Sequence, residues 1–104
     1  MTNAKQELLN HLVDIATKER IIKCAKITVH SSVVTQYKLK INYTKEEQEL
    51  FLESLDFMYD SGYGCQMLFG TIWYTDGTWS SRSEYDGSEW WEFNECPAVP
   101  KDLQ

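Results

Sequence analysis

The sequence predicts an α+β protein in which two helices pack on one face of a mainly antiparallel sheet, in the order α-β-β-α-β-β-β. Apolar residues recur at helical spacing in two stretches, and strand-like alternation follows each of them. Two Asp-Gly pairs ten residues apart then indicate tight turns between the last three strands. The 104 residues suffice for a single domain, which we expect to span positions 1–104.

The first element is a helix within residues 1–20, expected over 3–19. Leu8, Leu12 and Ile15 follow one another at spacings of four and three, which places them on one stripe of a helix. Thr2 or Asn3 can cap the start, because their side-chain oxygens accept hydrogen bonds from the free N–H groups of the first turn.

Residues 21–43 are expected to form a β-hairpin. The first half is rich in β-branched residues and ends at a His-Ser-Ser turn. In the second half Tyr37, Leu39 and Ile41 alternate with polar residues that include Lys38 and Lys40. This pattern predicts a half-buried strand with a cationic outer face.

A second helix is expected within residues 44–62. Thr44 and Glu47 have the spacing of a capping box, in which each side chain bonds to the backbone N–H of the other residue. Phe51, Leu55 and Tyr59 then recur every four residues as an apolar stripe, and carboxylates occupy the outer face. Gly62 is the expected C-terminal cap.

A three-stranded meander is expected over residues 65–96, followed by an extended tail over 97–104. Two-residue turns at Asp76-Gly77 and Asp86-Gly87 connect its strands. The first turn would pair Trp73 with Ser80, and the second would pair Arg82 with Trp91. The two prolines of the tail stop further pairing.

This register places Trp73, Arg82 and Trp91 in one row, with the guanidinium between two indoles. If the helices cover the other face, the row meets solvent or a partner. Tryptophan and arginine dominate binding hot spots, so these three residues and the flanking Glu84 and Glu89 are the candidate binding residues. The alternative is that the row packs as a second small core.

The charge distribution favours a basic partner. The net charge is −6, with seven Lys or Arg against three Asp or Glu in residues 1–43, and three against thirteen in residues 44–104. An acidic surface repels phosphate backbones and attracts basic proteins. A dense set of carboxylates can also imitate a phosphate backbone and occupy the basic groove of another protein. An ordinary solvated acidic surface is the alternative.

The sequence predicts no catalytic residue, metal site or cofactor. Cys24, Cys65 and Cys96 are odd in number and widely spaced, which argues against a disulfide framework and against a zinc site with His11 or His30. No Gly-rich phosphate loop is present. No apolar run approaches the roughly 18 residues of a membrane span, and the N-terminus lacks the apolar region of a secretory signal. We therefore expect a cytosolic protein.

The segment from Gly70 to Glu92, with Pro97-Ala-Val-Pro100 after it, resembles the C-terminal end of small uncharacterised proteins from tailed phages and prophages. Those proteins share Asp-Gly-Ser/Thr-Trp, an arginine, Glu-Tyr-Asp-Gly-Ser-Glu-Trp-Trp, and a closing Pro and Val/Ile-Pro. The match covers about a third of the chain. The resemblance implies a phage accessory protein in the cytoplasm of a bacterial host. Small phage proteins of this kind commonly bind and inhibit host proteins, including defence systems.

The leading hypothesis is therefore a non-enzymatic, phage-encoded domain that binds a host protein through an acidic, tryptophan-rich surface. The alternative is a nucleic-acid- or glycan-binding module that uses the aromatic row and the basic strand. Lysines on a strand more often protect an edge, so nucleic acid is the less favoured partner. A third hypothesis is a small hydrolase or isomerase. A homodimer formed through a strand edge also stays open.

Overall fold

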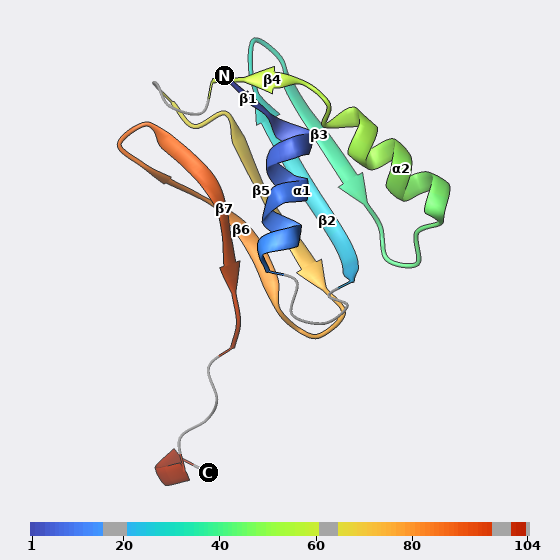
Figure 1. Cartoon of the computed structure of the whole chain (residues 1–104), viewed down its shortest axis with the longest axis vertical. Helices are drawn as coiled ribbons and strands as arrows, with labels where there is room; N and C mark the ends of the chain where they lie inside the picture. The colour runs from blue at the N-terminus through green and yellow to red at the C-terminus, as the bar shows by residue number, and fades with distance from the viewer. Residues whose placement is uncertain (16–20, 61–64, 97–100, 104) are drawn as a thin grey trace.

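The computed structural model describes residues 1–15, 21–60, 65–96 and 101–103, and it confirms the predicted α+β class (Figure 1). A five-stranded and a two-stranded antiparallel sheet combine with two helices. The elements are β1 (Thr2–Asn3), α1 (Ala4–Asp14), β2 (Ile22–His30), β3 (Val34–Leu39), α2 (Lys45–Ser54), β4 (Met58–Tyr59), β5 (Leu68–Tyr74), β6 (Trp79–Tyr85), β7 (Ser88–Asn94) and the 3₁₀ turn η1 (Lys101–Leu103).

The large sheet has the strand order β3-β2-β5-β6-β7, and one of its faces is covered by the helices. Figure 1 shows α1 lying across β2 and β5, and α2 lying beside β3. Buried side chains alternate along the strands, as Ala25, Ile27 and Val29 do in β2. They form one core with Leu8 of α1 and Phe51 of α2. The prediction of a single covered face is confirmed.

Both helix starts are capped as predicted. The Asn3 side chain accepts a hydrogen bond from the backbone N–H of Gln6 at 2.9 Å. Thr44 and Glu47 form the complete capping box, with both hydrogen bonds at 3.2 Å. α1 ends at Asp14, so the rest of the predicted helix falls on residues 16–20, which lie outside the described part of the chain.

The second helix is shorter than predicted, because its last predicted turn forms a strand. α2 ends at Ser54, and β4 pairs with β1. The backbone N–H of Ala4 donates to the carbonyl of Phe57 at 2.9 Å, and Tyr59 is 2% exposed. Aromatic residues favour an extended backbone, and the buried Tyr59 donates its hydroxyl to Glu7 of α1. The predicted cap at Gly62 lies outside the described residues.

The predicted hairpin of residues 21–43 is confirmed, but its second strand ends early. β2 and β3 pair from Ala25 opposite Leu39 to His30 opposite Val34. Asn42 has a φ of 62°, so the chain turns after β3, and Ile41 is 57% exposed instead of facing the core. In the predicted tail, residues 97–100 lie outside the described part, and η1 follows them.

The three-stranded meander is confirmed, but the register of its first hairpin is wrong by one residue. Trp73 pairs with Trp79 rather than with Ser80. The turn between β5 and β6 has three residues instead of the predicted two. In this turn Gly77 has a φ of 88° and donates its N–H to the carbonyl of Tyr74 at 3.3 Å. This is the hairpin loop that ends in a glycine bulge. The predicted turn at Asp86-Gly87 is confirmed, with positive φ at both residues.

The one-residue shift moves side chains to the other face of the sheet. Arg82 and Trp91, which pair as predicted, lie on the covered face together with Ile72. Trp73 lies on the opposite face, where it is 43% exposed. The predicted exposed row of Trp73, Arg82 and Trp91 is therefore wrong.

In the described ranges, no helix combines the length and the apolar character needed to cross a membrane.

Gly70→Ala is expected to destabilise the fold by about 1–3 kcal/mol, the usual cost of overpacking. A Cβ at this position would lie 2.5 Å from the carbonyl oxygen of Lys26, which is backbone and cannot move aside cheaply. Urea unfolding followed by circular dichroism measures the loss. The control is Thr71→Ala, at the next position of the strand, where the side chain lies on the uncovered face of the sheet. Its expected cost is under about 1 kcal/mol. Equal costs for the two variants would contradict the close strand approach at Gly70.

Candidate functional site

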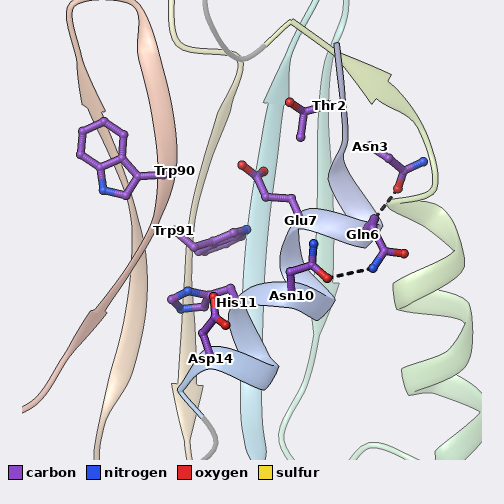
Figure 2. Close-up of a pocket in the computed structure, with 9 residues that line it drawn as sticks. All are labelled: Thr2, Asn3, Gln6, Glu7, Asn10, His11, Asp14, Trp90 and Trp91. Carbon is purple, nitrogen blue, oxygen red and sulfur yellow. Dashed lines mark hydrogen bonds between the residues drawn. The ribbon is translucent and has the colours of Figure 1, made fainter.

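A groove with a volume of about 400 Å³ lies between α1 and β7 (Figure 2). Most of the side chains that line it are polar. One face of α1 forms one wall, and β7 forms the other. Figure 2 shows the indole of Trp91 pointing toward α1, whereas that of Trp90 points to the other side of its strand. The groove is lined by Thr2, Asn3, Gln6, Glu7, Asn10, His11, Asp14, Trp90 and Trp91.

The polar wall follows from helical spacing. Asn3, Glu7, Asn10 and Asp14 are three or four residues apart, so their side chains lie above one another on one helix face. The adjacent face carries Leu8, which is fully buried against the sheet. Packing of the apolar face therefore turns the polar face toward β7.

A buried arginine cluster lies next to the groove. The Arg82 side chain is 1% exposed, and its Nη1 donates to Glu7 Oε1 at 2.9 Å. Its Nη2 donates to Glu89 Oε1 at 2.8 Å and to the Tyr59 hydroxyl at 2.9 Å. These contacts join α1, β4, β6 and β7 through one guanidinium group.

The guanidinium also contacts two aromatic rings. Its central carbon is 5.1 Å from the ring centroid of Trp91 and 5.9 Å from that of Tyr59. A cation within about 6 Å of an aromatic face is attracted by the ring quadrupole. The predicted stacking of Arg82 on an indole thus occurs with Trp91, but not with Trp73.

The Glu89 carboxylate fixes the far side of this cluster. It accepts hydrogen bonds from the backbone N–H groups of Met67 at 2.7 Å and Leu68 at 2.9 Å. Its side chain is 1% exposed. A buried carboxylate needs such donors, because burying an unpaired charge is very costly. Glu89 therefore connects the end of the β6–β7 hairpin to the start of β5.

Two groups of the cluster, Arg82 and Tyr59, have shifted pKa values. Burial lowers the pKa of Arg82, but the Glu7 charge and the hydrogen bonds to Glu89 and Tyr59 outweigh it, so the pKa lies above its ordinary value. Burial, helped by the hydrogen bond to Glu7, raises the pKa of Tyr59. Around neutral pH the guanidinium is therefore cationic and the phenol is neutral.

A second polar chain joins α1 to the sheet. His11 Nε2 is 2.8 Å from Ser80 Oγ, which is 2.7 Å from the Tyr74 hydroxyl. Serine within hydrogen-bond reach of histidine is the arrangement of an activated nucleophile. Ser80 is 0% exposed, however, so a substrate has no access to its hydroxyl. The chain satisfies buried hydroxyls and holds α1 in place.

The five predicted binding residues are divided among three environments. Arg82, Glu89 and Trp91 come together on the covered face. Glu84 lies opposite Glu89 on the neighbouring strand and is exposed. Trp73 lies on the open face, away from the other four. The structure thus joins three of the five, all with buried side chains.

Sequence reasoning missed the titratable residues of the groove, which are Glu7, His11 and Asp14. Their spacing of four and three was visible as a polar stripe. A polar stripe on a helix usually faces solvent. That β7 lies beside this stripe follows from the tertiary structure and not from the local sequence. The sequence signal was therefore present but not specific.

The described residues contain no group of three or more His, Cys, Asp or Glu side chains arranged to hold a metal ion. Cys24 is partly buried, whereas Cys65 and Cys96 are exposed, and all three are free thiols. Comparison of the chain with protein family models, curated proteins and solved structures finds no match.

The side chains that line the groove are acidic rather than basic, although the charge of Glu7 is balanced by Arg82 next to the groove. Glu7 and Asp14 contribute two carboxylates, and none of the described residues that line the groove is Lys or Arg. Burial lowers the pKa of His11, with a smaller contribution from Arg82, and the opposing effect of Asp14 is weaker than burial. His11 is therefore neutral at pH 7, and the groove suits a cationic group.

Arg82→Met is expected to lower the free energy of unfolding by about 3–5 kcal/mol, because Glu89 would remain buried without its cation. Chemical denaturation measures the change. Lys5→Met is the matched control, since Lys5 pairs with Glu53 at 2.6 Å but in an exposed position, where an ion pair contributes little. An effect of Arg82→Met no larger than that of the control would contradict the buried cluster.

His11 is expected to make stability depend on pH. Its pKa in the folded protein lies below the ordinary value of 6.5, so the unfolded chain takes up the proton first. The contribution of neutral His11 is complete above about pH 6.5 and is lost as the pH falls through the folded pKa. His11→Gln should flatten this part of the stability profile. A titration midpoint at or above 6.5 for His11 by NMR would contradict it.

Proposed function

We propose that this protein is a non-enzymatic interaction domain that binds a basic segment of another protein in the groove between α1 and β7. The observation that supports this most is the composition of the groove: two carboxylates, one indole wall and no cationic side chain among its described lining residues. A lysine or arginine side chain can lay its aliphatic stem along Trp91 and reach Asp14 with its charged end.

The groove is preorganised for such a ligand. Glu7 is held by Arg82 and by the Tyr59 hydroxyl, so its carboxylate loses little freedom when a partner binds. A preformed site avoids part of the ordering cost that weakens association. Arg82 itself acts through Glu7 and Trp91, because its side chain is too buried to touch a partner.

The rest of the chain supports a basic partner. Glu46 and Glu53 are exposed on α2 and add to the negative field. Complementary fields speed the encounter of two proteins and suppress wrong partners. From the resemblance to tailed-phage accessory proteins, we infer that the partner is a protein of a bacterial host. Occupying a basic surface of that protein, such as the nucleic-acid groove of a defence nuclease, would inhibit it.

The non-enzymatic part of the proposal is supported by the state of the polar residues at the groove. Ser80 is inaccessible, and the Glu89 carboxylate is bound to two backbone N–H groups and Arg82. Neither group is available to a substrate. Of the two carboxylates that line the groove, Asp14 is exposed on the last turn of α1, whereas Glu7 is 20% exposed and is paired with Arg82.

Asp14→Lys is expected to abolish capture of the partner. The substitution replaces a carboxylate of the groove by a cation. A cation in the last turn of a helix is favourable, so the fold should be kept. Tagged wild-type protein is used to capture proteins from bacterial lysate at low and at high salt, with identification by mass spectrometry. Glu49→Lys on α2 is the matched control, because it makes the same charge change away from the groove.

A host protein that is retained by the wild type and by Glu49→Lys, and lost with Asp14→Lys and at high salt, is the expected result. Equal capture by both variants would place the contact outside the groove. Capture of nothing by correctly folded wild-type protein would contradict the proposed function.

A further inference from the structure

The uncovered face of the five-stranded sheet carries a second candidate surface. Both described helices contribute to the core on the other face. On the open face Phe69 is 40% exposed, Trp73 43% and Trp90 40%, and Trp79 is partly buried beside Trp73. Exposed aromatic residues gathered on one face commonly mark a binding surface.

The aromatic side chains stand in two rows with a polar row between them. Trp73 pairs with Trp79 across β5 and β6, and Phe69 lies four residues before Trp73 on β5. At about 3.4 Å per residue, Phe69 and Trp73 are about 14 Å apart along the strand. Between them Thr71 pairs with Ser81, so hydroxyl groups fill the interval.

Two lysines extend the polar row on β2 and β3. Lys26 pairs with Lys38 on one side and with Thr71 on the other, and both lysines are exposed. Like charges directly opposite each other on neighbouring strands are destabilising. An anionic ligand would relieve this repulsion. The paired lysines and the exposed aromatic rings therefore favour a ligand that combines negative charges with flat rings.

Carboxylates are scarce on this face despite the net charge of −6. Among the described strand residues whose register places them here, Glu92 is the single carboxylate, and it lies on β7 at the far edge from the lysines. Glu84 and Glu89 lie on the covered face of the sheet. The two faces of the sheet thus differ in charge.

We propose that the open face binds single-stranded nucleic acid without sequence preference. Bases stack on Trp73 and Phe69, and the phosphate backbone passes Lys26 and Lys38. Aromatic platforms beside a cationic track are the usual means of binding unpaired strands, because every base has a π-face. A duplex hides those faces in its own stack. This surface is separate from the groove, so the inference does not depend on the proposed function.

The affinity should be modest and strongly dependent on salt. Two lysines neutralise few phosphates, and the distant carboxylates oppose binding, so we expect a Kd of about 10⁻⁴–10⁻⁶ M at low salt. Binding should weaken severalfold between about 50 and 200 mM salt.

The test is fluorescence anisotropy of a labelled oligothymidylate of about 20 nucleotides, long enough to cross the platform. Lys26→Gln with Lys38→Gln is expected to weaken binding at least fivefold, and Trp73→Ala about tenfold. Lys45→Gln with Lys101→Gln is the matched control, because both lysines are exposed and the charge change is the same. The control should stay within about twofold of the wild type.

A further variant guards against misfolding. Trp73→Tyr keeps a stacking ring and should bind within about threefold of the wild type, whereas a structural defect would affect both Trp73 variants. The lysine pair variant should still capture the host protein, which separates this inference from the groove. Failure of the wild type to bind the oligonucleotide at low salt, or equal weakening in the control pair, would overturn the proposal.

Discussion

The arrangement of this protein depends on one buried cation. Arg82 on β6 bonds to Glu7 of α1 and Tyr59 of β4, and through Glu89 of β7 it is connected to the backbone of β5. Burying such charges costs several kcal/mol per ion before pairing repays it. A cluster of this kind therefore contributes less to net stability than to selecting one packing arrangement, in which α1 sits at a fixed distance from the β6–β7 hairpin.

Two surfaces of different character follow from this constraint. Because α1 and the core occupy one face of the sheet, the polar side of α1 and Trp91 of β7 enclose a groove lined by carboxylates. The other face is left uncovered, with aromatic rings and the opposed pair Lys26 and Lys38. A chain that is acidic overall thus presents a groove suited to cations and a platform suited to an anionic, aromatic ligand.

Local signals in the sequence predicted the elements well, because caps and turns depend on a few neighbouring residues. The cap at Asn3, the box at Thr44 and the turn at Asp86-Gly87 are examples. Asp76-Gly77 was ambiguous, since Asp-Gly suits both a two-residue turn and a three-residue loop with a glycine bulge. The choice between them determined which face carries Arg82 and Trp91, whereas Trp73 lies opposite Ile72 with either turn. The groove was beyond sequence reasoning, because the polar stripe that includes His11 differs from a solvated helix face only through the strand beside it.

The state of the Arg82 guanidinium tests the central claim most directly. Solvent exchange of its N–H hydrogens, measured by ¹⁵N NMR and assigned with Arg82→Lys, reports whether the group is held by buried acceptors. We expect separate guanidinium signals whose hydrogens exchange far more slowly than those of a free arginine side chain, because Glu7, Glu89 and Tyr59 bind them out of contact with water. A single averaged signal with rapid exchange would show an exposed, unpaired arginine and would contradict the constraint on which both surfaces depend.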